Sequence, residues 1–315
     1  VMQLEKQSIL ARPVVAALLA SFCALLWGSA YPAIKLGYEL FSVGADDTAA
    51  KMAFAGLRFA LAGLLVFFVR FFQKGVKQSP RSLDRRQWGS IALLSLMQTT
   101  VHYYFFYVGV SYTTGAKSSI LNASSVFFSA ILAHFFYSND KISTRKAVGI
   151  LLGFLAVIMV NFESSLTLSA SLQGEGFVII AALLHSMSSL YSKRMSKSID
   201  PVLLTALQLF LGGSVLLGIA LLQGASFPRS SLAGFGLLAY MAGLSAAAFS
   251  LWTKLLKYNR VSSITIFNFL IPVFGTLLSA LVLGESVQRM QYLASLPLVA
   301  TGVILVTYSS SKAPV

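Results

Sequence analysis

Residues 261–284 read VSSITIFNFLIPVFGTLLSALVLG, a continuous run without a charged side chain. An α-helix needs about 20 predominantly apolar residues to cross the roughly 30 Å hydrocarbon core of a bilayer, and this run is long enough. Similar apolar runs follow one another along the whole chain, separated by short connections. The ten predicted spans are 13–36, 50–72, 88–110, 112–136, 145–161, 175–193, 201–223, 231–253, 261–284 and 290–309. The sequence therefore predicts an all-α integral membrane protein.

The composition agrees with a lipid environment. Of the 315 residues 57% are hydrophobic and only 11% are charged, whereas soluble proteins carry about 25% charged residues. The net charge of +14 would suggest a nucleic-acid partner in a soluble protein. Here, however, lysine and arginine lie in short segments between apolar runs, which is typical of membrane topology. We expect a lipid bilayer and a small molecule as partners, no nucleic acid, and no cofactor or metal.

Lysine and arginine are distributed unevenly between alternate connections. If both termini are cytoplasmic, 18 of the 24 such residues lie on the cytoplasmic side, five lie on the other side, and Arg58 lies within a span. Cytoplasmic loops of membrane proteins carry the excess of these residues. We therefore expect both termini to be cytoplasmic, in agreement with an even number of spans.

The sequence also repeats itself at long range. Residues 122–128, NASSVFF, align with residues 268–274, NFLIPVF, at an offset of 146, and Arg58 falls on Gln208 at an offset of 150. Such self-similarity is typical of proteins built from repeated units. The alignment predicts that each half of the chain forms one structural repeat.

The two predicted repeats span residues 13–161 and 175–309, with five helices in each. Because five is an odd number, the second repeat must be inserted upside down relative to the first. Inverted repeats are common in secondary transporters, where the substrate binds near the midplane at the interface between the repeats. The predicted fold is thus ten transmembrane helices arranged as two inverted five-helix repeats.

Four segments carry a resemblance to a known family. They are residues 24–32 (ALLWGSAYP), 57–59 (LRF), 272–285 (PVFGTLLSALVLGE) and 302–306 (GVILV). With these motifs the chain resembles EamA-type transporters of the drug/metabolite transporter superfamily, over nearly its whole length. The resemblance implies alternating access by two helix bundles in a plasma membrane, often for export of amino acids or other small metabolites. It does not name a substrate.

All ten acidic residues lie in predicted loops or at helix ends. Carriers of cationic drugs and many proton-coupled carriers use a buried carboxylate, so their mechanisms are disfavoured here. Arg58, by contrast, is a strongly basic residue well inside a predicted span. It can anchor an anionic substrate, since a guanidinium binds carboxylate or phosphate bidentately. It can equally be a structural arginine that binds backbone carbonyls or reaches the surface.

Other polar residues within the spans have two possible roles each. His102 and His185 can relay a proton or donate to an anion, or they can pack as neutral, hydrogen-bonded residues. Asn122 and Asn268 occupy equivalent positions in the two repeats, where they can bind substrate or join helices. Aromatic rings and glutamines complete a candidate pocket, although packing is the commoner role of such rings. The candidate substrate-binding residues are Trp27, Arg58, Gln98, His102, Tyr104, Asn122, His185, Gln208, Trp252 and Asn268.

The leading functional hypothesis is a secondary transporter for an amino acid or related small organic acid, working by export or exchange. Phosphorylated sugars or nucleotide-type anions are the alternative substrates, and two or more converging basic groups would favour them. An enzyme is disfavoured because the sequence lacks H-E-x-x-H, G-x-S-x-G and phosphate-binding glycine motifs, so no catalytic residues are assigned. A receptor or assembly subunit remains the hypothesis outside transport, but the short loops offer it little surface.

Overall fold

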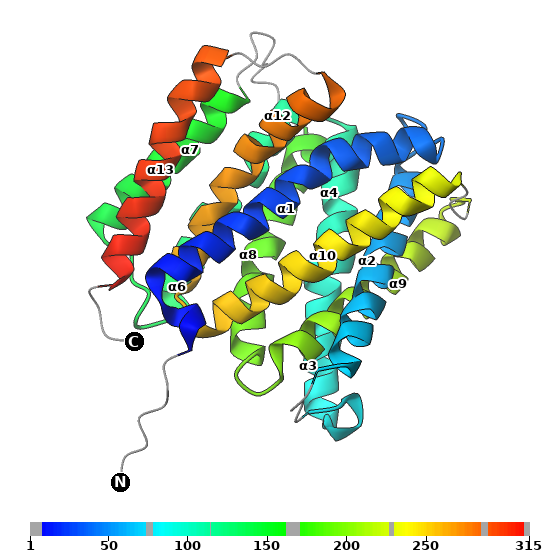
Figure 1. Cartoon of the computed structure of the whole chain (residues 1–315), viewed down its shortest axis with the longest axis horizontal. Helices are drawn as coiled ribbons and strands as arrows, with labels where there is room; N and C mark the ends of the chain where they lie inside the picture. The colour runs from blue at the N-terminus through cyan, green and yellow to red at the C-terminus, as the bar shows by residue number, and fades with distance from the viewer. Residues whose placement is uncertain are drawn as a thin grey trace.

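The structure of this chain is a computed structural model that describes residues 8–73, 78–113, 115–161, 171–226, 230–284 and 289–311, and its regular elements there are all helical. Glu285 of the 272–285 motif lies outside these residues. The helices are Pro13–Leu40 (α1), Thr48–Phe71 (α2), Arg85–Ser95 (α3), Leu96–Val101 (η3), His102–Ser111 (α4), Gly115–Asn122 (α5), Ser125–Phe136 (α6), Thr144–Val160 (α7), Leu172–Gly176 (η4), Phe177–Met195 (α8), Pro201–Leu222 (α9), Leu232–Tyr258 (α10), Val261–Thr265 (α11), Ile266–Phe269 (η5), Leu270–Leu283 (α12) and Arg289–Ser311 (α13), with short 3₁₀ turns at Ile9–Ala11 (η1) and Pro80–Ser82 (η2) (Figure 1).

Within the described residues, eight helical segments are long and apolar enough to cross a membrane. They correspond to eight of the ten predicted spans. The predicted span 88–110 falls on α3, η3 and α4, where a π-helical segment interrupts the α-helix. The predicted span 145–161 falls on α7, which has 17 residues. The chain is therefore an all-α, multi-pass membrane protein.

Several helices have an acidic residue as their N-cap, directly before the first helical residue. The side chains of Asp47, Asp84 and Asp200 accept hydrogen bonds from backbone N–H groups in the first turns of α2, α3 and α9. A carboxylate in this position satisfies N–H groups that have no partner within the helix. The placement of these acids at helix ends thus follows from the need to cap helices.

Glycines allow helices from the two halves of the chain to approach closely. A Cβ added at Gly63 of α2 would lie 2.4 Å from the backbone nitrogen of Phe210, and one at Gly213 of α9 would lie 2.4 Å from that of Ala60. At the contact of α7 with α13, a Cβ on Gly302 would lie 2.6 Å from the carbonyl oxygen of Gly149. Small residues at such contacts are typical of helix packing in membranes.

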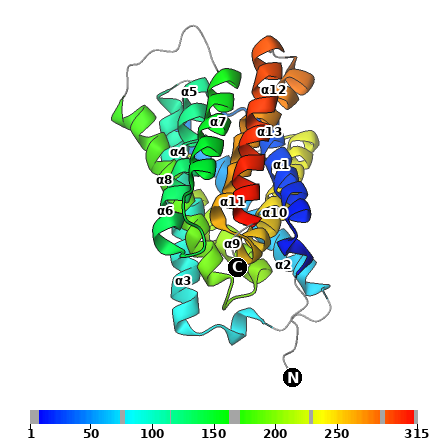
Figure 2. The same ribbon diagram turned by 90° about the vertical axis from the view of Figure 1, so that its left-hand side faces the viewer.

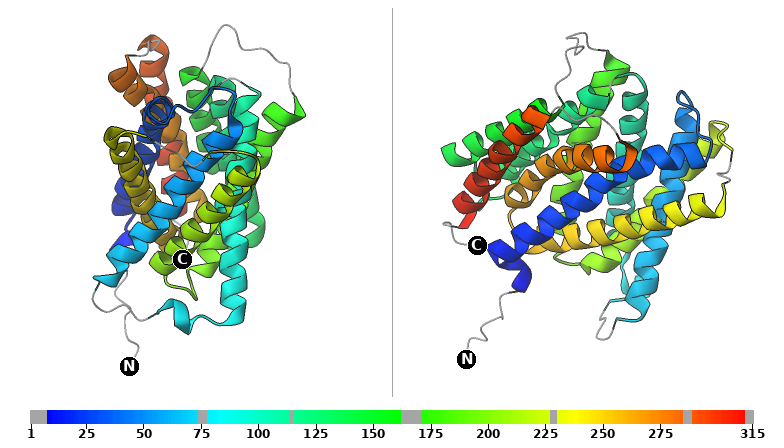
Figure 3. Two further views of the ribbon diagram at one scale, coloured as in Figure 1. Left: turned by 90° about the vertical axis from the view of Figure 1, so that its right-hand side faces the viewer. Right: turned by 45° about the horizontal axis from the view of Figure 1, so that its top comes forward.

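The helices of the two halves are intermixed. In Figure 1 α1 and α10 cross the front of the molecule side by side, and α12 lies along the other side of α1. Figure 2 views the molecule from the side of α7 and α13, and the left panel of Figure 3 views it from the side of α2 and α9. These two contacting pairs flank the remaining helices, so each side of the molecule is built from both halves of the chain.

A buried ion pair lies near the C-terminal end of α6, and its carboxylate also binds the second half of the chain. The Lys146 ammonium lies 2.6 Å from a carboxylate oxygen of Asp140, and each side chain is only 1% or 2% exposed. Asp140 also accepts hydrogen bonds from the backbone N–H of Ser262, at 3.0 Å, and from the Ser262 hydroxyl. We refer to Asp140, Lys146 and Ser262 as the Asp140 cluster. It ties the α6–α7 connection to the start of α11.

The end of α8 is attached to the same region. Its Lys193 donates to the backbone carbonyl of Asn259, which precedes α11, and lies 5.2 Å from the ring centroid of Tyr137. The Asn259 amide donates in turn to the carbonyl oxygen of Leu10, at 2.8 Å. These bonds hold α8, α10 and the residues before α1 together at this end.

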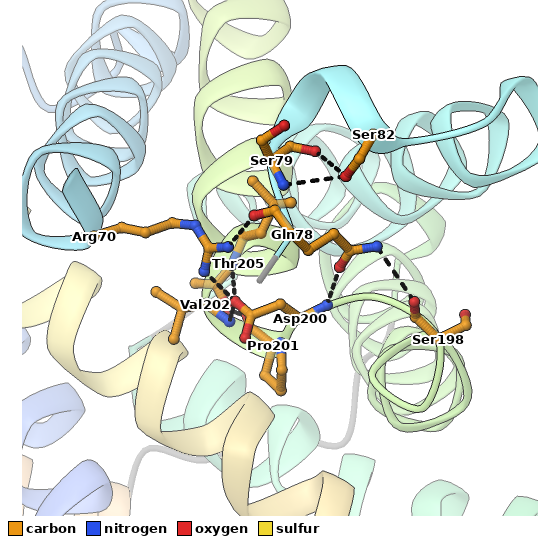
Figure 4. Close-up of polar contacts among 10 residues, drawn as sticks. Arg70, Gln78, Ser79, Ser82, Ser198, Asp200, Pro201, Val202 and Thr205 are labelled. Atoms are coloured by element: carbon orange, nitrogen blue, oxygen red, sulfur yellow. Dashed lines mark hydrogen bonds and ion pairs between the residues drawn. The ribbon is translucent and has the colours of Figure 1, made fainter. Parts of the chain in front are cut away.

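A second ion pair holds the end of α2 against the start of α9 (Figure 4). Arg70 pairs with Asp200 and donates to the carbonyl oxygen of Gln78, at 2.5 Å. The Gln78 side-chain oxygen accepts from the backbone N–H of Asp200, at 2.6 Å, and its amide nitrogen donates to the Ser198 carbonyl, at 3.4 Å. Polar groups near the ends of α2, α6 and α8 are therefore bonded across the two halves.

Candidate functional site

A cavity of about 150 Å³ lies between the two halves of the chain. That is several times the roughly 30 Å³ that one water molecule occupies in the liquid, yet smaller than the pockets that hold drug-sized ligands. Residues of α1, α2, α4, α5 and α6 line it from the first half, and residues of α8, α10, η5 and α12 from the second. The space suits a small molecule.

Arg58 lines this cavity with a side chain that is only 4% exposed. Its Nε donates to the hydroxyl of Ser245, on α10, at 2.8 Å, and its guanidinium carbon lies 5.0 Å from the Phe59 ring centroid. The Ser245 hydroxyl donates onward to the carbonyl oxygen of Met241, at 2.8 Å. In the described part of the chain, Arg58 has no carboxylate partner and its terminal nitrogens have no acceptor. A buried guanidinium without a counter-charge can bind an anion.

Three residues that line the cavity each carry a buried polar atom without a hydrogen-bond partner among the described residues. These atoms are the indole nitrogen of Trp27, Nδ1 of His102 and the side-chain oxygen of Asn268. Most buried polar atoms in proteins are hydrogen-bonded, and each exception calls for an explanation. A polar ligand is one such explanation, because all three residues line the cavity.

The two histidines predicted within spans meet at this cavity. The ring centroids of His102, on α4, and His185, on α8, are 5.4 Å apart, and both residues line the cavity. Tyr103 and Tyr107 lie on the same helix as His102 and also line it. Among its described residues, the cavity wall thus combines the Arg58 cation, two imidazoles and several aromatic rings.

The two asparagines that the repeat alignment predicts to be equivalent also lie at this cavity. Asn122 is the last residue of α5, where the helix is interrupted before α6, and Asn268 lies in the 3₁₀ segment η5 between α11 and α12. Both line the cavity. Interrupted helices at the interface between repeats are where secondary transporters commonly bind their substrates.

The other four predicted site residues do not line the cavity. Gln98 lies in the π-helical segment η3, and Gln208 accepts a hydrogen bond from the Thr99 hydroxyl at 2.8 Å. Trp252 is buried behind Trp27, with ring centroids 4.9 Å apart. Tyr104 packs against the hydrophobic cluster of α2 and α9.

The position of Gln98 has a physical cause. Residues four apart share one face of an α-helix, so in a regular α-helix Gln98 and His102 would face the same way. A π-helix closes its hydrogen bonds over five residues and rotates the following residues. Because η3 ends directly before His102, the α-helical spacing does not apply there.

Sequence reasoning missed several residues of this site. Ser245, the hydrogen-bond partner of Arg58, is one of many serines in the spans, and nothing in the sequence distinguishes it. Tyr31, Phe106 and Phe249 line the cavity as well. Tyr31 lies inside the 24–32 motif, which was the available signal for it.

The sequence of this chain matches a known protein family. The model of the EamA-like transporter family matches residues 14–162 and again residues 172–308, which is most of the chain. The chain belongs to the EamA-like transporter family. The resemblance drawn from the sequence motifs is confirmed, and family membership makes this a membrane transporter.

Relatives of this EamA-family chain extend over most of its length. The uncharacterized transporter sll0355 of Synechocystis sp. is 27% identical and covers 85% of this chain and 82% of its own. The uncharacterized transporter YoaV of Bacillus subtilis is 24% identical, with 91% and 95% covered. The WAT1-related protein At3g02690, chloroplastic, of Arabidopsis thaliana is 25% identical, with 87% and 65% covered.

A solved crystal structure has the same fold. It superposes with a TM-score of 0.74 at 14% identity and covers 93% of this chain and 98% of its own. At this identity the likeness concerns the fold alone.

Proposed function

We propose that this EamA-family protein is a secondary transporter that moves an amino acid or related small organic acid by alternating access. Its substrate would bind in the central cavity, with Arg58 as the anchor for a carboxylate. The observation that carries this proposal is the Arg58 guanidinium, buried in a cavity lined by both halves and without an acidic partner among the described residues. A carrier for an anion needs such a charge at the interface of its two moving parts.

The proposal includes ten spans in two inverted repeats, residues 13–161 and 175–309. In that scheme α1 corresponds to α8, α2 to α9, the α3–α4 segment to α10, the α5–α6 segment to α11–α12, and α7 to α13. Helix contacts obey this exchange: α1 packs on α12 as α8 packs on α6, α1 on α10 as α8 on α4, and α2 on α10 as α9 on α3. The same exchange maps the α2–α9 contact onto itself, and it does the same for the α7–α13 contact. A pseudo-two-fold relation between the halves explains this pattern.

We place the protein in the plasma membrane with both termini cytoplasmic. The distribution of lysine and arginine along the sequence supports this orientation. In it, the Asp140 cluster and the Arg70–Asp200 pair belong to the cytoplasmic side, and the cavity is built largely from the middle and outer parts of the spans. The bonded cytoplasmic ends are then what must separate when the carrier opens inward.

The charge of the cavity favours a carboxylate over a phosphate ester. A doubly charged phosphate calls for two or more converging basic groups, since desolvating each charge is costly. The described residues that line the cavity include a single arginine, Arg58, and no lysine. A singly charged small acid therefore fits better than a phosphorylated sugar or a nucleotide.

Counterflow tests the proposal directly. Purified protein in liposomes loaded with one unlabelled acid should accumulate the same labelled acid, and Arg58→Ala should abolish this uptake. Arg58→Lys keeps the charge without the planar fork and should retain a small part of it. Folding of both variants is checked by size-exclusion chromatography and thermal unfolding. Exchange of sugar phosphates without flux of amino or organic acids would contradict the proposal.

A further inference from the structure

The cavity holds a positive charge but no negative one in the part of the chain that the structure describes. None of the described Asp or Glu residues lines it. Several of these acids are engaged elsewhere: Asp47, Asp84 and Asp200 cap helices, Asp140 pairs with Lys146, and Glu175 accepts from Thr113 at 2.8 Å. A ligand that brings a cationic group would therefore meet Arg58 and no counter-charge from the described acids.

This matters because amino acids and organic acids differ in one group. An α-amino acid carries an ammonium next to its carboxylate, and a buried cation is costly unless a charge or several acceptors compensate it. The ammonium of such a ligand would also lie close to Arg58 once its carboxylate is bound there. The corresponding 2-hydroxy acid carries the same carboxylate and an uncharged hydroxyl instead.

The unpartnered atoms of the wall point to the same choice. The Trp27 indole N–H must donate, whereas the Asn268 side-chain oxygen must accept. A hydroxyl accepts and donates at once, so it can serve either atom or both. An ammonium has three donors and no acceptor, so it can serve Asn268 but not Trp27, whereas a hydroxyl can serve both.

We propose that the cavity selects small monocarboxylates whose second polar group is uncharged, such as 2-hydroxy acids, over zwitterionic amino acids with the same carbon skeleton. This inference rests on the proposed function, because it assumes that Arg58 binds a carboxylate in this cavity. It narrows the substrate class from two kinds of acid to one. Arg58 binds the carboxylate, and Trp27 and Asn268 form hydrogen bonds with the second polar group of the ligand.

A single substitution should reverse the preference. Asn268→Asp places the missing carboxylate in the wall without changing the size of the side chain. An ammonium then gains a counter-charge, while a hydroxy acid gains a repelling one. Asn122→Asp, at the equivalent position of the other half, is a second variant that keeps the test decisive if the first does not fold.

The experiment compares lactate with alanine, and 2-hydroxyisovalerate with valine, by tryptophan fluorescence of the purified full chain and by competition in counterflow. Trp27 lies in the cavity wall, so ligands that enter change its emission. In the wild type we expect each hydroxy acid to bind about tenfold or more tightly than its amino acid, since unpaired polar groups strongly reduce binding. In either Asp variant that ratio should fall by about tenfold or invert.

The outcomes separate this inference from the proposed function. Alanine and valine binding as tightly as the hydroxy acids in the wild type would overturn the inference, while small-acid transport would stand. An unchanged ratio in a folded Asp variant would overturn the reading of Trp27 and Asn268 in the same way. If folded wild-type protein binds none of the four acids, the proposed function fails and this inference fails with it.

Discussion

The central cavity and the Asp140 cluster both contain buried polar side-chain atoms, but only in the cluster does each of these atoms have a partner among the described residues. In the cluster, Asp140 and Lys146 are each 1% exposed, and the carboxylate has three donors. In the cavity, Trp27, His102 and Asn268 each keep an atom without a partner among the described residues. An unpaired buried polar atom costs about 1–3 kcal/mol of stability, whereas a paired one does not carry that cost.

The difference separates residues that hold the fold from residues that await a ligand. The Asp140 cluster joins two halves of the chain, and each of its polar side chains has a partner, as a structural contact requires. The cavity keeps unmatched donors and acceptors that lower stability, which a protein retains where binding uses them. Stability and ligand binding should therefore respond in opposite ways to substitutions in the two regions.

The largest effect is expected in the cluster. Asp140→Ala leaves the Lys146 ammonium buried without its counter-charge and should lower the free energy of unfolding by about 3–5 kcal/mol. Denaturant titration in detergent micelles measures this loss. Asp84→Ala is the matched control, since this exposed acid only caps α3 and should cost about 1 kcal/mol. Equal losses in both variants would break the comparison, because the cluster would then contribute no more than an ordinary helix cap.

The contact between α2 and α9 tests packing without polar groups. Gly213→Ala places a Cβ 2.4 Å from the backbone of Ala60, so the helices must move apart, at a cost of about 1–3 kcal/mol. Gly218→Ala on the same helix meets nothing within 4 Å and should be neutral or stabilising by roughly 0.5–1 kcal/mol. Thermal unfolding of the two variants measures how much stability a close contact between two helix backbones contributes without polar side chains. A destabilised Gly218→Ala would contradict the packing described here.

Removing an unmatched group should have a smaller effect, of the opposite sign. Asn268→Leu replaces the unpartnered amide oxygen by an apolar group of similar shape and should raise the free energy of unfolding by about 1 kcal/mol. Counterflow by the same variant should fall. If stability drops instead, the amide has a structural partner and the cavity does not differ from the cluster.

The last prediction asks whether the cluster closes one end of the carrier, and it is measured by labelling rates rather than by stability. With Cys23 replaced by alanine, Ser129→Cys puts a reporter thiol on α6, at a position that is fully buried. Asp140→Asn removes the negative charge of the ion pair but keeps the shape of the side chain. In this variant a membrane-impermeant thiol reagent added on the cytoplasmic side should label the α6 reporter faster. A second reporter, Ser119→Cys, lies in the cavity wall. The same reagent added on the outer side should label that reporter more slowly. Faster labelling of both reporters would mean general loosening.

Much of the candidate site could be predicted from the sequence because charge and amide groups are rare within apolar spans. Arg58, Asn122 and Asn268 stand out for that reason, and the structure brings them to one cavity. Gln98 could not be placed correctly, since the π-helical segment before His102 changes the rotation of the helix. Ser245 could not be found, because its role depends on which residue faces it from α2.

The helical membrane fold, most of the spans and the family could be predicted from the sequence alone, because hydropathy and motifs are properties of consecutive residues. Only the tertiary structure decided which polar groups are paired. Asp140 pairs with Lys146, which is six residues away in the chain, and with Ser262, which is 122 residues away. Trp27 and Asn268 belong to different halves of the chain and line one cavity. Such meetings depend on how each helix is rotated and on which helix lies opposite. These are set by packing between distant segments, such as the glycine contacts of α2 with α9.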